Sequence, residues 1–191
     1  KRVVARGRPA RPGGSVENLG TLTLAGVTMT GNRAAEGGGA ISNAATGTLR
    51  LIRSTLRGNS SGGAGGGLVN DGTAAILAST VAGNSAATIA GGILNNGALD
   101  LVESTLSDNT ASEGGGGLDN EGSAKLTRTA VTGNTSRGRA GGLDNRGTLI
   151  LVNSTVSGNN GLDDVGGIAN FGALGLFSST VCDNTSQGTG G

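Results

Sequence analysis

The sequence of 191 residues contains no histidine, tryptophan or tyrosine. Without histidine, the chain lacks the side chain that most often serves as a general base or metal ligand near neutral pH. Its only aromatic residues, Phe171 and Phe177, provide no platform on which bases or sugars could stack. The single cysteine, Cys182, excludes an intramolecular disulfide, and we expect it to be an exposed thiol. We therefore predict no nucleic-acid partner and no histidine- or cysteine-based chemistry.

Long apolar runs are also missing. No stretch of 18 apolar residues occurs, so we predict no membrane span in this segment. The first residues do not resemble a signal peptide, and we expect a mature form or a piece of a longer chain. Forty glycines and few aromatic residues would ordinarily indicate disorder, but a strict internal repeat overrides that interpretation.

Two asparagine columns define the repeat. Their members recur every 25 residues, apart from one spacing of 27 that places a two-residue insertion within residues 44–46. The first column consists of Asn18, Asn43, Asn70, Asn95, Asn120, Asn145 and Asn170. The second consists of Asn32, Asn59, Asn84, Asn109, Asn134, Asn159 and Asn184. Units this short cannot bury an apolar face alone, so they must stack.

Apolar residues two apart recur in each unit, as in Leu149 and Leu151, which is the spacing of one face of a β-strand. Each unit supplies about three such short strands, separated by glycine and asparagine. We therefore predict an all-β chain that forms a right-handed parallel β-helix, or β-solenoid, of about seven coils of 25 residues.

The recurring polar residues have structural explanations. Asparagine tolerates turn conformations and can hydrogen-bond the equivalent amide one coil away, so we predict internal asparagine ladders, with a metal or ligand site as the alternative. Paired glycines such as Gly141-Gly142 permit tight bends without Cβ clashes. In the recurring Ser-Thr pairs, alternation places serine inward, where the hydroxyls can satisfy each other, and threonine outward.

Residues 1–17 form a basic N-terminal segment, which we expect to be a cap or first strand, with a flexible arm as the alternative; residues 18–191 hold the β-helix repeats. Residues 1–57 carry a net charge of +7, from nine Lys/Arg and two Glu, and residues 58–191 carry −6, from five and eleven. The rod is therefore an electrostatic dipole. The chain ends where the next Gly-Gly would begin without a visible polar cap, so we expect continuation or a covering partner.

Few carboxylates are candidates for chemistry. Asp163-Asp164 is the only adjacent acidic pair, in a variable turn, and could hold a cation or substrate. Asp100 with Lys125, and Glu103 with Arg128, stack one coil apart and are expected to be surface ion pairs. We predict no catalytic residues, no cofactor and no metal site.

The unit resembles repeats of the polymorphic outer-membrane protein class and of related secreted bacterial β-helix proteins. Gly38-Gly39-Ala40-Ile41 matches the Gly-Gly-Ala-Ile motif of that class, and its Phe-x-x-Asn motif occurs here with Met, Leu or Val for Phe, as in Val156-Ser157-Gly158-Asn159. The resemblance covers residues 18–191. It implies a secreted or cell-surface passenger, often adhesive, without catalytic residues.

The favoured hypothesis is a non-catalytic extracellular or cell-surface structural or adhesive solenoid that assembles head to tail into a homo-oligomer or filament and binds a surface glycan or protein. A polysaccharide lyase or hydrolase is the first alternative, because β-helices include such enzymes. An ice-binding solenoid is the second, because the threonine column faces outward, although Arg57 interrupts the neighbouring column. One further column is apolar and is either an exposed lateral stripe or corner packing: Ala25, Ile52, Leu77, Val102, Val152 and Phe177.

Overall fold

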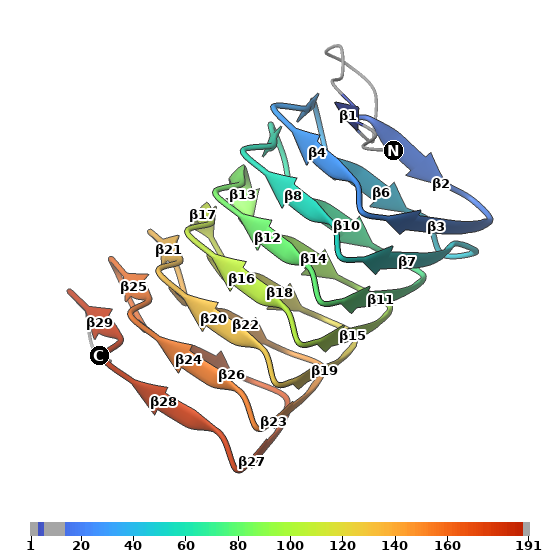
Figure 1. The fold of residues 1–191 in the computed structure, drawn as a ribbon. Coiled ribbons are helices and arrows are strands. Elements are labelled where there is room, and N and C mark those ends of the chain that lie inside the picture. The colour runs from blue at the N-terminus through green and yellow to red at the C-terminus, as the bar shows by residue number, and fades with distance from the viewer. Residues whose placement is uncertain (1–3, 6–13, 189–191) are drawn as a thin grey trace.

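The computed structural model describes Val4–Ala5 and residues 14–188, and every regular element in those residues is a β-strand. The chain winds into stacked coils that form an elongated solenoid (Figure 1). No helix that could cross a membrane occurs in Val4–Ala5 or between residues 14 and 188.

Four sheets run along the solenoid, and each coil gives one strand to each of them. Sheet A contains β1 (Val4–Ala5), β4 (Thr28–Thr30), β8 (Thr55–Arg57), β12 (Thr80–Ala82), β16 (Thr105–Ser107), β20 (Ala130–Thr132), β24 (Thr155–Ser157) and β28 (Thr180–Cys182). Sheet B contains β2 (Val16–Asn18), β6 (Ile41–Asn43), β10 (Leu68–Asn70), β14 (Ile93–Asn95), β18 (Leu118–Asn120), β22 (Leu143–Asn145) and β26 (Ile168–Asn170).

The other two sheets differ in strand length. Sheet C has five-residue strands: β3 (Thr21–Ala25), β7 (Thr48–Ile52), β11 (Thr73–Leu77), β15 (Ala98–Val102), β19 (Ser123–Thr127), β23 (Thr148–Val152) and β27 (Ala173–Phe177). Sheet D has mostly two-residue strands: β5 (Arg33–Ala34), β9 (Ser60–Ser61), β13 (Ser85–Ile89), β17 (Thr110–Glu113), β21 (Thr135–Ser136), β25 (Asn160–Gly161) and β29 (Thr185–Ser186).

All pairings between coils are parallel, and from β10 onward register partners are 25 residues apart, as Leu68 with Ile93 and Leu118 with Leu143. One register shift occurs in sheet D, where Ile89 of β13 pairs with Glu113 of β17. The predicted all-β parallel β-helix of about seven coils is therefore confirmed. The strand count per coil was too low in the prediction, because the two-residue strands of sheet D carry no apolar alternation.

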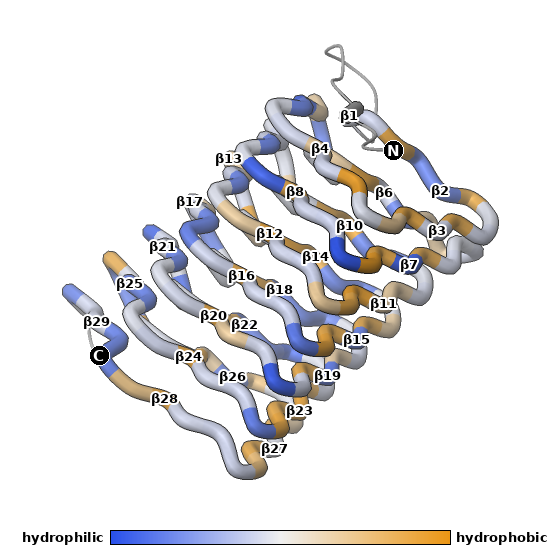
Figure 2. The backbone as a smooth tube through the Cα atoms, in the orientation of Figure 1, coloured by the Kyte–Doolittle hydropathy of each residue, from blue (hydrophilic) through white to orange (hydrophobic). Residues whose placement is uncertain are grey.

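The core lies inside the coils. Its large apolar side chains come from the inward positions of sheets A, B and C, and sheet D adds small ones such as Ala86 and Ala111. Leu101, Leu106 and Leu118, one from each of these sheets, are fully buried and belong to the same apolar cluster. Apolar segments recur from coil to coil along sheet C (Figure 2). Since each unit leaves its apolar edges to be covered by the next, stacking buries surface that one coil could not bury.

Both asparagine columns form internal ladders, as predicted. Asn70 Nδ2 donates to Asn95 Oδ1 over 2.7 Å, and this contact repeats along the first column. In the second column, Asn109 Nδ2 donates to Asn134 Oδ1 over 2.9 Å. The Asn109 backbone amide donates to that same oxygen. The ladders leave no free amide group in the middle of either column for a metal or ligand, so the structural interpretation holds there.

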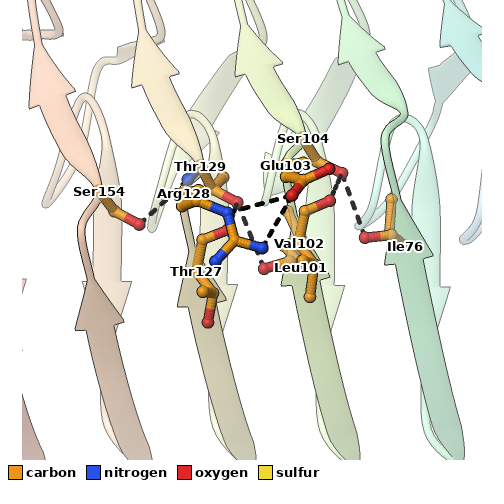
Figure 3. Close-up of polar contacts among 9 residues, drawn as sticks. All are labelled: Ile76, Leu101, Val102, Glu103, Ser104, Thr127, Arg128, Thr129 and Ser154. Atoms are coloured by element: carbon orange, nitrogen blue, oxygen red, sulfur yellow. Dashed lines mark hydrogen bonds and ion pairs between the residues drawn. The ribbon is translucent and has the colours of Figure 1, made fainter.

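The inward serines are buried as predicted, but their partners are backbone groups. Ser104 Oγ donates to the carbonyls of Ile76 and Val102 (Figure 3). Ser154 Oγ accepts a hydrogen bond from the backbone amide of Thr129 (Figure 3). The hydroxyls therefore satisfy the backbone at the bend between sheets C and A, and they do not bond to each other.

The basic N-terminal segment contributes β1 and β2 to the stack, where Val4 pairs with Thr28 and Val16 with Ile41. Residues 1–3 and 6–13, which carry its five positive charges, lie outside the described residues.

The two-residue insertion lies in the turn between β6 and β7, where the Gly47 amide donates to the Ala44 carbonyl.

Candidate functional site

The predicted surface ion pairs have different outcomes. Arg128 Nη2 lies 2.8 Å from Glu103 Oε1, and both side chains are exposed, so this pair is confirmed (Figure 3). Asp100 and Lys125 are register partners, but no ion pair joins them among the described residues. They line a shallow hollow of about 210 Å³ on the outer face of sheet C, together with Thr73 and Ser123.

The acidic pair Asp163-Asp164 lies in the turn between β25 and β26, with Asp163 exposed and Asp164 half-buried. The Asp164 carbonyl accepts a hydrogen bond from Ser186 Oγ. In the part of the chain that the structure describes, no three His, Cys, Asp or Glu side chains gather closely enough to hold a metal ion.

The threonine column lies on the outer face of sheet A, where Thr80 pairs with Thr55 on one side and Thr105 on the other. Ala130 interrupts it, as the sequence shows. The neighbouring column contains Arg57, Ala82 and Ser107, so the outer face is not a uniform threonine surface.

The remaining predicted features are surface features. The apolar column at the end of the sheet C strands is half-buried at Ile52, Leu77, Val102 and Val152, where the chain bends into sheet A. Phe177 of the last coil is 57% exposed. Cys182 is a free thiol and is half-buried, whereas we expected it to be exposed. The Asp183 carboxylate, which accepts a hydrogen bond from the thiol, raises the pKa of Cys182. A thiol with a raised pKa is a poorer nucleophile at neutral pH.

Two buried carboxylates, Asp119 and Asp144, were absent from the predicted candidates. They are register partners at the middle positions of β18 and β22 in sheet B, and neither side chain is exposed to solvent. Alternation points Leu118 and Asn120 into the core, so Asp119 points to the outer face of the sheet. Its burial comes from the segment before β18, which folds back over that face: a Cβ at Gly114 would lie 2.1 Å from Asp119 Oδ2.

The identity of the covering residue decides how each carboxylate is satisfied. The residue five positions before each middle position of sheet B is Ile89 for Leu94, Gly114 for Asp119 and Arg139 for Asp144. Arg139 Nη1 donates to Asp144 Oδ2 over 3.1 Å, and Arg146 Nη2 lies 3.5 Å from that oxygen. Gly114 occupies the equivalent position over Asp119 and has no side chain, so the covering segment provides no positive charge to Asp119.

Within residues 14–188, three buried carboxylate oxygens of this pair therefore lack hydrogen-bond partners: Oδ1 and Oδ2 of Asp119, and Oδ1 of Asp144. Burial, together with the charges of Asp144 and Glu121, raises the pKa of Asp119 to about 7. The Gly115 amide and Arg139 oppose this shift. The Gly115 amide is near the carboxylate but its geometry falls short of a hydrogen bond. Burial also raises the pKa of Asp144, against the opposing effect of Arg139.

Sequence reasoning missed this pair because strict alternation assigns the middle residue of each sheet B strand to solvent. One signal was present: Val69 and Leu94 occupy that outward position in earlier coils. Apolar residues recurring at an outward position indicate that something covers them. Two aspartates one repeat apart at a covered position then predict a buried like-charge pair.

The chain matches no protein-family model, no curated protein and no solved structure. Its class is therefore defined by the fold: it is a parallel β-helix repeat protein, with four sheets and internal asparagine ladders.

Proposed function

We propose that this chain is a non-catalytic structural or adhesive β-solenoid of the extracellular space or cell surface, in the manner of the polymorphic outer-membrane protein class that its repeats resemble. The observation that supports this most is where the ionisable groups lie. Those with strongly perturbed environments, Asp119 and Asp144, are sealed from solvent, and a side chain without exposure cannot touch a polymer substrate. The exposed carboxylates lie on open faces or in surface ion pairs such as Glu103 with Arg128.

The chemistry of glycan cleavage supports the same proposal. Lyases and hydrolases need two carboxylates, or a carboxylate and a base, on one accessible surface. The hollow of about 210 Å³ presents one carboxylate, Asp100, beside Lys125. A second hollow, of about 300 Å³, is lined mainly by apolar residues of the last coil, including Ile168, Leu174 and Leu176.

A glycan array and a pull-down from cell-surface extracts test the adhesive role, and we expect binding without cleavage. The same protein is incubated with a panel of polysaccharides. Depolymerisation of any of them would contradict the proposal if it depends on the acidic pair. It should then be lost in the double variant Asp163→Ala with Asp164→Ala and kept in Asp71→Ala, which changes another exposed carboxylate. That result would establish the enzyme alternative.

We also propose that copies of the solenoid assemble head to tail. The support for this proposal is the charge asymmetry along the solenoid: residues 1–57 carry +7 and residues 58–191 carry −6, so unlike parts of two copies attract each other. A contact between unlike ends does not close, so it produces filaments.

Association should weaken with salt, because exposed charges are screened beyond ~8–10 Å at physiological ionic strength. Sedimentation across a salt series measures it. Arg50→Glu with Arg53→Glu, in the basic part, should reduce association several-fold, and Arg137→Glu, in the acidic part, should not. A species that stays monomeric at low salt and high concentration would refute assembly.

A further inference from the structure

Asp119 and Asp144 form a buried pair of carboxyl groups that has more oxygen atoms than cations or hydrogen-bond donors to satisfy them. The two residues are register partners on neighbouring strands, which lie about 4.8 Å apart in a sheet. Arg139 and Arg146 both direct their guanidinium groups to one oxygen, Asp144 Oδ2. The other three oxygens of the pair have no partner among the described residues, and both carboxyl groups are fully buried.

One bound proton would remove a negative charge from the pair and supply a hydrogen-bond donor. A neutral Asp119 carboxyl group has an O–H donor, and the unpartnered Asp144 Oδ1 of the adjacent strand is an acceptor without a donor. We propose that Asp119 and Asp144 share one proton beneath the segment of residues 112–116, and that loss of this proton releases the segment from the outer face of sheet B.

The charged groups around the pair determine which carboxyl group ionises first. Glu121 and Arg139 act on both, and Asp164 and Arg146 act on Asp144. Because two arginines contact Asp144, it loses its proton while Asp119 is still neutral. The resulting charge on Asp144 then acts with burial to raise the pKa of Asp119 to about 7. Arg146 also pairs with Glu121 over 2.7 Å, so it cannot neutralise a second aspartate.

The covering segment is the part that can respond. Gly114 lies directly on Asp119 Oδ2 and has a φ of 65°, a left-handed conformation. The side chain of Ile89 also lies close to Gly114, and neither residue offers a donor side chain to Asp119. The nearby Gly115 amide makes no hydrogen bond to either oxygen of Asp119, so a charged Asp119 needs water as a donor. Water can reach the buried carboxylate when the covering segment lifts.

A metal ion fits these contacts poorly. The described residues contain no group of three potential ligands, and Arg139 and Arg146 already place two positive charges beside Asp144. Calcium takes six to eight oxygen ligands in proteins, and the pair has three free oxygens. The proton is therefore the occupant that the geometry supports.

The sign of the pH dependence follows from linkage. The folded protein holds a proton on Asp119 up to about pH 7, whereas the unfolded chain releases it near 3.8. Stability from this group is thus present at low pH and is lost as the pH rises between about 4 and 7. Relative to Asp119→Asn, the folded-to-unfolded ratio of the natural chain should fall by up to about tenfold per pH unit between pH 5 and 7.

Urea unfolding of the natural chain, Asp119→Asn and Asp119→Leu at pH 5 to 8 tests the proposal. Neither variant should lose stability as the pH rises from 5 to 7. Asp119→Leu introduces the residue found at the equivalent position 94, so it provides the test if Asp119→Asn folds poorly. Asp163→Asn, at an exposed carboxylate, should keep the natural profile. Infrared spectroscopy should show a protonated carboxyl band at pH 5 that disappears by pH 8 and is absent from both Asp119 variants.

Hydrogen exchange, corrected for intrinsic rates, tests release of the cover. Protection of residues 112–116 should fall above pH 7, while residues 62–66, the equivalent cover over Val69, should keep theirs. Identical pH profiles for the natural chain and Asp119→Asn would overturn the shared proton. Unchanged exchange despite loss of the carboxyl band would overturn the release. Stabilisation by calcium at pH 8 that requires Asp119 would replace the proton with a cation.

Discussion

Replacing Asn109 with alanine should lower the free energy of unfolding by about 3–5 kcal/mol, since a buried polar group left without a partner costs ~1–3 kcal/mol. Asn109 Oδ1 accepts hydrogen bonds from the backbone amide and the side-chain amide of Asn84. Asn109 Nδ2 donates to the Val81 carbonyl and to Asn134 Oδ1. Alanine removes all four contacts at a site that water does not reach.

Asn96→Ala is the matched control. The Asn96 side chain donates a hydrogen bond from Nδ2 to Asp71 Oδ1 in an exposed position. Its loss should change stability by less than about 0.5 kcal/mol. Urea unfolding followed by circular dichroism measures both variants, and equal effects at positions 96 and 109 would show that the ladder does not stabilise the interior.

The sequence predicts the ladders because few polar residues can stack on copies of themselves inside a solenoid and still form all their hydrogen bonds. A residue that recurs every 25 positions stacks on itself, and asparagine both donates and accepts, so it can repeat without leaving an orphan. The same reasoning predicts serine inward and threonine outward at the corner after sheet C. It does not predict that the serine hydroxyls bond to backbone groups, because that depends on the positive-φ bend at residues such as Glu103.

The ladder reasoning does not extend to the buried aspartates, for which the sequence signal is the apolar Val69 and Leu94 at the equivalent position. Alternation within β18 gives the direction of Asp119 but carries no information about what covers it. The cover comes from the turn after sheet D, whose path depends on backbone contacts such as Gly114 against Asp119. The prediction for paired glycines holds at Gly116, which lies in a bend and where a Cβ would clash with backbone atoms. The pattern within one unit does not show that those backbone atoms belong to the next coil.

Gly116→Ala should lower the free energy of unfolding by about 3 kcal/mol or more, which lies at the upper end for overpacked interiors. A Cβ at this position would lie 2.3 Å from the Gly141 carbonyl oxygen and 2.6 Å from that of Thr135. Both are backbone atoms of the next coil, so no side-chain rotation relieves the contact. The coils cannot move apart either, because the Gly116 amide donates to the Ala140 carbonyl over 2.8 Å.

Substitutions at two other glycines serve as controls that distinguish the steric clash at Gly116 from effects on backbone conformation. Gly83 has a φ of 60° and open space where an added methyl group would lie, so Gly83→Ala should cost only about 1 kcal/mol of left-handed strain. Gly20 has open space and no positive φ, and Gly20→Ala should be neutral or stabilise slightly. Comparable losses at positions 20 and 116 would mean that the approach of the coils is not what selects glycine.

The shape of the unfolding curve provides a further test of Gly116→Ala. In a stacked repeat, each coil contacts only its neighbours, and stability is approximately a sum of coil and interface contributions. A defect between the coils of Gly116 and Gly141 weakens one interface in the middle of the stack. The two blocks on either side should then unfold at separate urea concentrations, so the single transition of the natural chain should broaden or split. Gly83→Ala alters an exposed corner within one coil and should move the transition without splitting it.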